Sequence, residues 1–255
     1  MNRKLLSYTL IALLLLSVCS TFAGAGETEI NQHYRGLLQS HVADGVVDYH
    51  GFKKDEKVLD QYLDALNLTD PETLSHDEKL AFYINAYNAY TIKLILDNFD
   101  EKNPPSSIKK IGSLFTSPWK ISFAKVAGTV YSLDNIEHDI IRKEWNEPRI
   151  HFAVNCASRS CPPLISEPYR GESIDAQLET STKAFLADKR MNYLEGETLF
   201  ISSIFKWYAE DFKDDPRQFI LDHTEGEMHE RLAQLGKNVK IKYLDYDWSL
   251  NDKMN

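Results

Sequence analysis

Cysteine is scarce in this sequence, and positive charge is outnumbered by negative charge. The 255 residues include three cysteines, 29 lysines and arginines, and 38 aspartates and glutamates, which gives a formal net charge of −9. An acidic protein repels phosphate, and this argues against nucleic acid or an anionic membrane surface as a partner. Internal repeats and low-complexity segments are also missing. These absences leave an acidic globular protein whose partner is a small molecule or a peptide.

Long apolar runs are missing too, and the one short run lies near the start of the chain. Residues 10–16 are apolar, follow the basic residues Arg3 and Lys4, and precede the small residues 23–25. This order is typical of a secretory signal peptide, and the run is too short to span a membrane stably. We therefore expect residues 1–25 to be a signal peptide. The mature protein should be periplasmic or secreted, soluble, and without a stable membrane span.

Cys19 lies inside this predicted signal, so a lipid-anchored protein is the alternative. A lipoprotein signal needs a small residue directly before its cysteine, and Val18 is not small, which favours release. Removal of residues 1–25 takes away Arg3 and Lys4 and changes the net charge from −9 to −11. The remaining residues, 26–255, are enough for a single globular domain with its own core.

The strongest helical pattern follows Ser75. Ser75 and Glu78 form the sequence signature of a capping box. The residues that follow are apolar on almost every side, which predicts a buried central helix. Asn85 and Asn88 lie on this helix, and buried amides need hydrogen-bond partners. They either bond the backbone of neighbouring loops or face a functional site.

Short strands are expected between the later helices. One hairpin is predicted to turn at residues 127–129 and another at residues 195–196, and residues 239–243 form a predicted final strand. Apolar residues alternate with other residues over 150–154, which predicts a central strand. This mixture favours an α+β fold, with helices packed on a mainly antiparallel sheet around a central buried helix.

The stretch 149–164 contains both cysteines outside the predicted signal, Cys156 and Cys161. The predicted strand leads into a loop rich in Asn, Ser and Arg, and two prolines end the loop. A rigid strand that leads into an exposed loop is a suitable place for chemistry. Two nearby cysteines in an exported protein also predict a disulfide between Cys156 and Cys161.

A thiol hydrolase, such as a periplasmic peptidase or amidase, is one interpretation of this loop. It needs a cysteine nucleophile, a histidine base and an orienting polar group. The candidates are Cys156 or Cys161, His151 or His138, and Glu137 or Asn85. A buried helix on an antiparallel sheet is loosely similar to the papain and transglutaminase architecture. In those enzymes the nucleophile opens the central helix, whereas this helix carries Asn85 and no cysteine.

A ligand-binding or structural domain is the interpretation that we favour. The disulfide would stiffen the loop, and its exposed tip would present Arg159 and Ser160 beside Asn155. These groups would receive an anionic ligand such as a carboxylate. Asn85 and Asn88 would belong to the same polar site.

Metal binding and thioredoxin-like chemistry are less favoured. Zinc binds residue types that are present here, but the two histidines do not lie in a motif, and no cofactor is expected. The four possible ligands are Cys156, Cys161, His138 and His151. A thioredoxin-like redox role requires Cys-x-x-Cys, and the spacing of Cys156 and Cys161 differs from it.

Several passages together resemble the bacterial family catalogued as domain of unknown function 547. The resemblance covers about residues 75–251, and it implies that these passages form a shared site or core. It implies no reaction. The passages are Ala81-Phe-Tyr-Ile-Asn85-Ala-Tyr-Asn88-Ala, Ser132-Leu-Asp-Asn-Ile-Glu137-His138, Ile150-His-Phe-Ala-Val-Asn-Cys-Ala-Ser-Arg-Ser-Cys-Pro-Pro-Leu164, Ser203-Ile-Phe-Lys-Trp-Tyr208 and Tyr246-Asp-Trp-Ser-Leu-Asn251.

Overall fold

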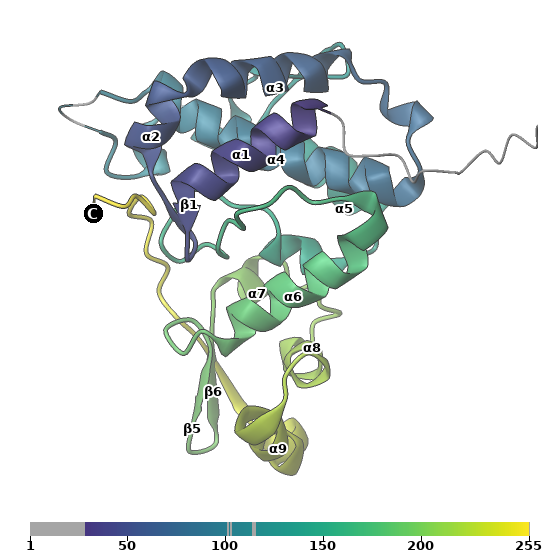
Figure 1. The fold of residues 1–255 in the computed structure, drawn as a ribbon. Coiled ribbons are helices and arrows are strands. Elements are labelled where there is room, and N and C mark those ends of the chain that lie inside the picture. The colour runs from purple at the N-terminus through teal and green to yellow at the C-terminus, as the bar shows by residue number, and fades with distance from the viewer. Residues whose placement is uncertain (1–28, 101, 103, 114–115, 255) are drawn as a thin grey trace, which may run out of the picture.

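The computed structural model of this chain describes residues 29–100, 102, 104–113 and 116–254. The predicted signal peptide lies outside these residues. Figure 1 shows a group of helices at one end of the molecule and a small sheet with short helices at the other. Within the described part of the chain, no helix combines the length and apolarity that crossing a membrane requires.

The N-terminal half is a group of helices packed around α4 (His76–Asp97). Helix α1 (Glu29–His41) packs on α3 (Glu56–Leu68), and both α2 (Tyr49–Lys54) and α3 pack on α4. The predicted capping box is confirmed, because the Ser75 hydroxyl accepts from the Glu78 N–H and the Glu78 carboxylate accepts from the Ser75 N–H. Most side chains of α4 are buried, as expected of a helix that is apolar on almost every side.

The strands of the described residues form three small sheets. Antiparallel hairpins join β1 (Val42–Ala43) to β2 (Val46–Val47) and β3 (Ala124–Val126) to β4 (Thr129–Tyr131). The third sheet has the order β5 (Tyr193–Glu195), β6 (Thr198–Ile201), β7 (Lys240–Tyr243), and its β6–β7 pair is parallel. The α+β class and both predicted hairpins are confirmed. The similarity to papain is only loose, because the described strands are divided among separate small sheets.

The predicted central strand at residues 150–154 is wrong. Its first part is the 3₁₀ helix η5 (Pro148–Phe152). Pro148 occupies the first turn, where a missing N–H costs nothing, and the Glu147 carboxylate caps the helix by accepting from the Arg149 N–H. Ile150, His151 and Phe152 are all buried. The alternation of apolar and other residues in this segment therefore does not mark the buried and exposed faces of a strand.

A π-helical segment, η4 (Asn135–Ile141), carries Glu137 and His138 and continues into α5 (Arg142–Glu144). π-Helical turns are rare and occur frequently at functional sites. The remaining helices are α6 (Ile174–Ala187), α7 (Ile204–Trp207), α8 (Pro216–Asp222), α9 (Gly226–Leu235), and the 3₁₀ helices η1 (Pro71–Thr73), η2 (Ile108–Lys110), η3 (Pro118–Lys120), η6 (Gly171–Ser173) and η7 (Gly236–Asn238).

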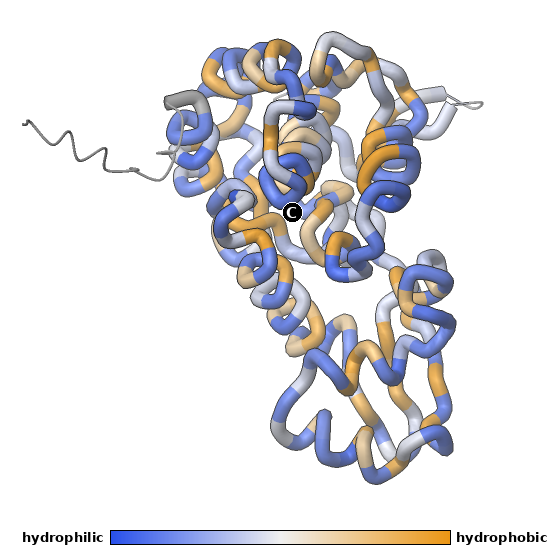
Figure 2. The backbone as a smooth tube through the Cα atoms, turned by 90° about the vertical axis from the view of Figure 1, so that its right-hand side faces the viewer, coloured by the Kyte–Doolittle hydropathy of each residue, from blue (hydrophilic) through white to orange (hydrophobic). Residues whose placement is uncertain are grey.

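Two hydrophobic cores hold these elements together. The larger core surrounds α4, and the smaller one gathers phenylalanines around Phe152. The Phe152 ring lies 5.1 Å from the Phe185 ring and 5.7 Å from the Phe205 ring. Figure 2 shows hydrophobic and hydrophilic stretches alternating along the helices, as expected of helices that bury one face. Helix η5 therefore anchors the start of the cysteine loop in both cores, with Ile150 in the larger and Phe152 in the smaller.

Candidate functional site

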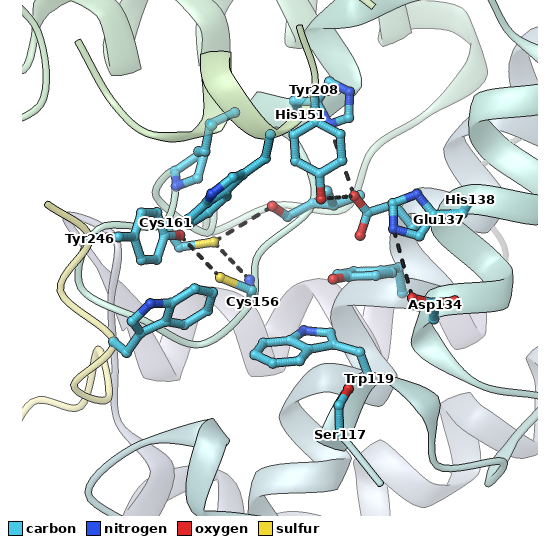
Figure 3. Close-up of a pocket in the computed structure, with 16 residues that line it drawn as sticks. Ser117, Trp119, Asp134, Glu137, His138, His151, Cys156, Cys161, Tyr208 and Tyr246 are labelled. Atoms are coloured by element: carbon cyan, nitrogen blue, oxygen red, sulfur yellow. Dashed lines mark hydrogen bonds and ion pairs between the residues drawn. The ribbon is translucent and has the colours of Figure 1, made fainter. Parts of the chain in front are cut away.

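A cleft of about 240 Å³ brings together five of the six residues that the sequence offered for catalysis, all except Asn85. They are Glu137 and His138 from η4, His151 from η5, and Cys156 and Cys161 from the cysteine loop. Figure 3 shows Cys156, Cys161 and Tyr246 on one side of this cleft and Glu137, His138 and Asp134 on the other. The arrangement joins residues that lie far apart in the sequence.

Glu137 is a buried acid at this cleft. The residue is 5 % exposed, and its Oε1 accepts a hydrogen bond of 2.6 Å from the Tyr208 hydroxyl. The His151 Nδ1 lies 4.0 Å from the same oxygen and is therefore beyond hydrogen-bonding distance. Glu137 thus brings a carboxylate into a largely aromatic environment.

His151 is held by groups behind the cleft. Its Nε2 lies 2.6 Å from the Asp211 Oδ2, and its ring stacks on the Tyr208 ring at 3.8 Å. Arg142 donates to both oxygens of Asp211, at 2.7 and 2.8 Å. Burial tends to raise the pKa of Asp211, but the hydrogen bonds from His151 and Arg142 hold this pKa well below its usual range. Asp211 is therefore an anion that accepts from Nε2–H, and the Nδ1 of His151 faces Glu137.

His151 lies on the 3₁₀ helix η5 rather than on the predicted strand, and it faces the helix that carries Glu137. The side chain of Asn85, another candidate for the orienting group, bonds the backbone of Tyr169 instead. His138 accepts from Arg142 through Nδ1 at 3.0 Å. Among the described residues, neither histidine hydrogen-bonds a cysteine sulfur.

The two cysteines are free thiols in close contact. The backbone N–H of Cys156 donates to the Cys161 Sγ at 2.8 Å. The Cys156 Sγ lies 3.1 Å from the Ser158 hydroxyl and 3.2 Å from the Tyr246 hydroxyl. The Ser158 hydroxyl also donates to the Tyr246 hydroxyl at 3.2 Å, so the two hydroxyls and the Cys156 sulfur form one network. Rotation of either O–H bond turns its proton toward a thiolate. The disulfide remains a prediction for the oxidised protein.

The environments of the two sulfurs favour different protonation states. Burial raises the pKa of Cys156, but hydrogen bonds from Cys161, Ser158 and Tyr246 outweigh burial and bring this pKa below its ordinary value. Burial and the neighbouring Cys156 raise the pKa of Cys161 well above its ordinary value. Cys156 therefore ionises first, and Cys161 keeps its proton.

Asn88 and Asn155 fix the cysteine loop from its inner side. The Asn88 amide donates to the Ala153 carbonyl at 2.9 Å and accepts from the Asn155 N–H at 2.8 Å. The Asn155 amide donates to the Pro162 carbonyl at 2.8 Å and accepts from the Ala157 N–H at 2.9 Å. Ala157 has a φ of 58°, a left-handed conformation that is uncommon outside glycine and that these contacts hold in place.

Asn85 binds a neighbouring loop in the same way. Its side chain donates to the Tyr169 carbonyl at 2.7 Å and accepts from the Tyr169 N–H at 2.8 Å. Asn85 and Asn88 therefore bond the backbone of neighbouring loops, which is the first of the two roles expected of them. Neither of them, nor Asn155, belongs to the cleft lining. The ligand-binding role expected of these three amides remains a prediction that the geometry does not favour.

The exposed loop tip that the sequence predicted is largely covered. Ser158 and Ser160 are 1 % and 4 % exposed, because the segment 246–251 crosses over them. The Ser160 hydroxyl accepts from the Asp247 N–H at 2.9 Å, and the Ser160 N–H donates to the Asp247 carbonyl. Arg159 is exposed and lines a second cavity, of about 320 Å³, on the other side of the loop. Arg159 and Ser160, which were expected to share one ligand, are thus separated.

Sequence reasoning missed the aromatic walls of the cleft. Trp207 is 47 % exposed and lines the cleft. Trp248 lies 5.6 Å from Trp207 and 5.5 Å from Trp119, measured between ring centroids. Tyr87, Tyr208 and Tyr246 complete this lining. Five of these six aromatics, all except Trp119, lie in passages that carried the family resemblance, and that membership was the available signal.

Metal chemistry was the third interpretation of the cysteines and histidines. Within the part of the chain that the structure describes, no three side chains of His, Cys, Asp or Glu are arranged to hold a metal ion. His138 and His151 lie beside Asp134 and Asp211 respectively, rather than beside the two sulfurs.

The comparisons with known proteins agree with the resemblance stated from the sequence. Residues 71–186 match the model of the family described as "Protein of unknown function, DUF547". The match includes α4, the π-helical segment and the cysteine loop. No curated protein and no solved structure matches the chain. The family description names no reaction, so an assignment of function has to rest on the geometry of the cleft.

Proposed function

We propose that the cleft binds a small molecule or peptide that carries a basic group on a flat or apolar body. The observation that carries this proposal is the buried carboxylate of Glu137 in a cleft whose walls are aromatic. Such a ligand would place its ammonium or guanidinium group at Glu137. Its apolar body would lie against the tryptophans.

The charge balance around Glu137 supports a cationic ligand. A buried carboxylate costs free energy unless a cation or several hydrogen bonds compensate it. Tyr208 supplies one hydrogen bond to Glu137, and His151 stays 4.0 Å away. The nearby guanidinium of Arg142 is committed to Asp211 and Glu210. A ligand cation would supply the charge that Glu137 lacks.

The aromatic walls support the same ligand class. Aromatic faces attract cations and bury flat apolar groups. The face of Trp248 already receives a cation, since the Lys109 Nζ lies 4.7 Å from its ring centroid. The acidic character of the chain, with a formal net charge of −9, favours a basic ligand as well. Export to the periplasm or medium, inferred from residues 1–25, is part of this proposal.

A matched pair of probes tests it. Benzylamine is cationic at neutral pH, and benzyl alcohol has a similar shape without charge. We expect tryptophan fluorescence to report binding of benzylamine, and Glu137→Gln to weaken that binding about tenfold or more, since a charge-assisted hydrogen bond contributes about 1.5–3 kcal/mol. Glu227→Gln, on the exposed surface of α9, is the control. Equal affinity for both probes, or no effect of Glu137→Gln, would refute the proposal.

A thiol hydrolase is the second candidate, and the hydrogen-bonded Cys156 sulfur is the observation that favours it. The nucleophile would act as a thiolate without a histidine base in contact. The test is steady-state hydrolysis of p-nitrophenyl acetate by the mature protein. Turnover that Cys156→Ala abolishes would support hydrolysis, whereas a Cys156→Ala variant as active as the parent would remove Cys156 as the nucleophile.

A further inference from the structure

We infer that Cys156 and Cys161 form a reversible dithiol–disulfide exchange site that opens into the cleft. Cys156 is the attacking sulfur, and Cys161 is the sulfur that resolves the mixed disulfide. The substrate class is a disulfide, or the corresponding thiols, of a small thiol compound or a peptide. The inference stands apart from the proposed cation site, because it depends on the sulfurs and their donors rather than on Glu137.

The first support is the position of the sulfurs. The Cys161 Sγ lies 2.8 Å from the backbone nitrogen of Cys156. A sulfur this close to the main chain of its partner comes within reach of the partner's sulfur by rotation about the Cα–Cβ bond. Asn155 ties the two ends of the loop together through the Pro162 carbonyl. The backbone is therefore already fixed in the closed loop that a disulfide between Cys156 and Cys161 needs.

The second support is the difference between the two sulfurs. Cys156 is half-buried and has the Ser158 and Tyr246 hydroxyls beside its sulfur. Cys161 is buried, and its sulfur accepts from the Cys156 N–H. Thiolate is the attacking species in exchange, and hydrogen-bond donors stabilise it at Cys156. The lowered pKa of Cys156 and the raised pKa of Cys161 agree with this division.

The exchange balances without any further reagent. The Cys156 thiolate attacks one sulfur of a disulfide RS–SR′, which forms the mixed disulfide Cys156–S–S–R and releases R′S⁻, which takes up a proton. Cys161 then loses its proton and attacks the Cys156 sulfur. This second step closes the Cys156–Cys161 disulfide and releases RS⁻, which is protonated in turn. Counted from the dithiol, whose Cys156 proton has passed to solvent before the attack, two electrons and two protons are transferred to the substrate, and thiols reverse the reaction.

The donors also set the direction in which the pair works. The Ser158 and Tyr246 hydroxyls stabilise the Cys156 thiolate, which exists in the reduced protein and not in the disulfide. Stabilising the reduced form makes the oxidised form a stronger oxidant. The disulfide should therefore be reducible by glutathione, unlike a disulfide that serves as a structural staple.

The first experiment equilibrates the mature protein in buffers with different ratios of reduced to oxidised glutathione. Alkylation and mass spectrometry then give the oxidised fraction. We expect both forms to interconvert with a midpoint inside this buffer range. Tyr246→Phe should demand about tenfold more reducing conditions, because it removes a donor to the thiolate. Tyr243→Phe, on β7, is the matched control. A pair that stays fully oxidised, or fully reduced, in every buffer would overturn the inference.

A second experiment assigns the attacking sulfur. Cys161→Ser should accumulate a mixed disulfide between Cys156 and glutathione, and Cys156→Ser should stay unmodified while folded. Circular dichroism checks that each variant is folded, and Cys161→Ala replaces Cys161→Ser if that variant is not. Equal rates of modification for the two single-cysteine proteins would contradict the assigned roles.

Discussion

Two buried polar regions meet at the cysteine loop, and they differ in what their hydrogen-bonding atoms contact. On the inner side, the amides of Asn88 and Asn155 bind backbone groups through both their oxygen and their nitrogen. On the cleft side, Glu137 accepts from one tyrosine, and the buried Nδ1 of His151 has no hydrogen-bond partner within the described part of the chain. The amides of the inner region already have hydrogen-bond partners, whereas the cleft region keeps hydrogen-bonding capacity for a ligand.

This difference separates structural from functional polar residues better than residue type does. Both regions contain buried side chains capable of recognition chemistry. Helix α4 even contributes to both, since Asn88 holds the loop while its neighbour Tyr87 lines the cleft. The hydrogen-bonded amides of the inner region make the loop rigid, and this rigidity keeps the polar groups of the cleft in place. Each prediction below changes one side of this comparison.

The largest effect is expected from Asn88→Leu. The substitution leaves the Ala153 carbonyl and the Asn155 N–H buried without partners. Each such group costs about 1–3 kcal/mol, so the free energy of unfolding should fall by about 2–6 kcal/mol in urea denaturation. Asn238→Leu, at an exposed position, should change it by less than about 0.5 kcal/mol. Equal stability of the two variants would show that the inner region is not structural.

Ser158→Ala should act on reactivity instead. The Ser158 hydroxyl lies 3.1 Å from the Cys156 sulfur, so its loss removes a donor and raises the pKa of Cys156. Alkylation by iodoacetamide at neutral pH should slow by up to about tenfold, because one pKa unit changes the thiolate fraction by that factor. The rate profile should move to higher pH. Ser249→Ala is the control, and an unchanged profile for Ser158→Ala would remove Ser158 as a donor.

Asp211→Asn should make stability less dependent on pH in acid. The folded-state pKa of Asp211 is depressed, so its contribution is fully present above the unfolded value of about 4 and is lost as pH falls below it. At pH 7 we expect Tm to drop by about 2–4 °C, which corresponds to about 1 kcal/mol in a chain of this size. The difference from wild type should vanish in strong acid. Asp214→Asn, an exposed neighbour, should show no such trend.

The smallest effect is expected from Arg159→Ala. Arg159 is exposed and lines the cavity on the far side of the loop, rather than the cleft. Removal of its charge should leave benzylamine binding and Cys156 alkylation within about twofold of wild type, since exposed charges separated from a site are screened. A loss of binding comparable to that of Glu137→Gln would mean that the two sides of the loop act as one site.

The parts of the fold that the sequence predicted correctly are those with local causes. The capping box of Ser75 and Glu78 is complete within four residues, and each hairpin is closed by a turn that its own residues define. The strand predicted at residues 150–154 failed for a related reason. Pro148 and the Glu147 cap are local signals for a helical turn, but burial of all sides at η5 made the apolar alternation misleading.

The candidate site was predictable only in part, because its remaining members arrive through long-range contacts. Glu137, His138, His151 and Cys156 were found from residue type and from the family resemblance. Asp211 lies 60 residues after His151, and Tyr246 lies 90 residues after Cys156. Pairwise contacts over such separations depend on how the two cores pack, and no local pattern in the sequence specifies that packing.

The crossing of residues 246–251 over the cysteine loop has a consequence for the order of events in a cell. Tyr246 and Trp248 form part of the cleft wall, and Asn251 bonds the Ala157 carbonyl at the bend of the loop. While a nascent chain is still too short to include these residues, the loop lacks its cover, and Cys156 meets solvent and other thiols directly. Incorrect disulfides between Cys156 and other thiols would therefore form in the interval after the loop is synthesised and before residues 246–251 cover it.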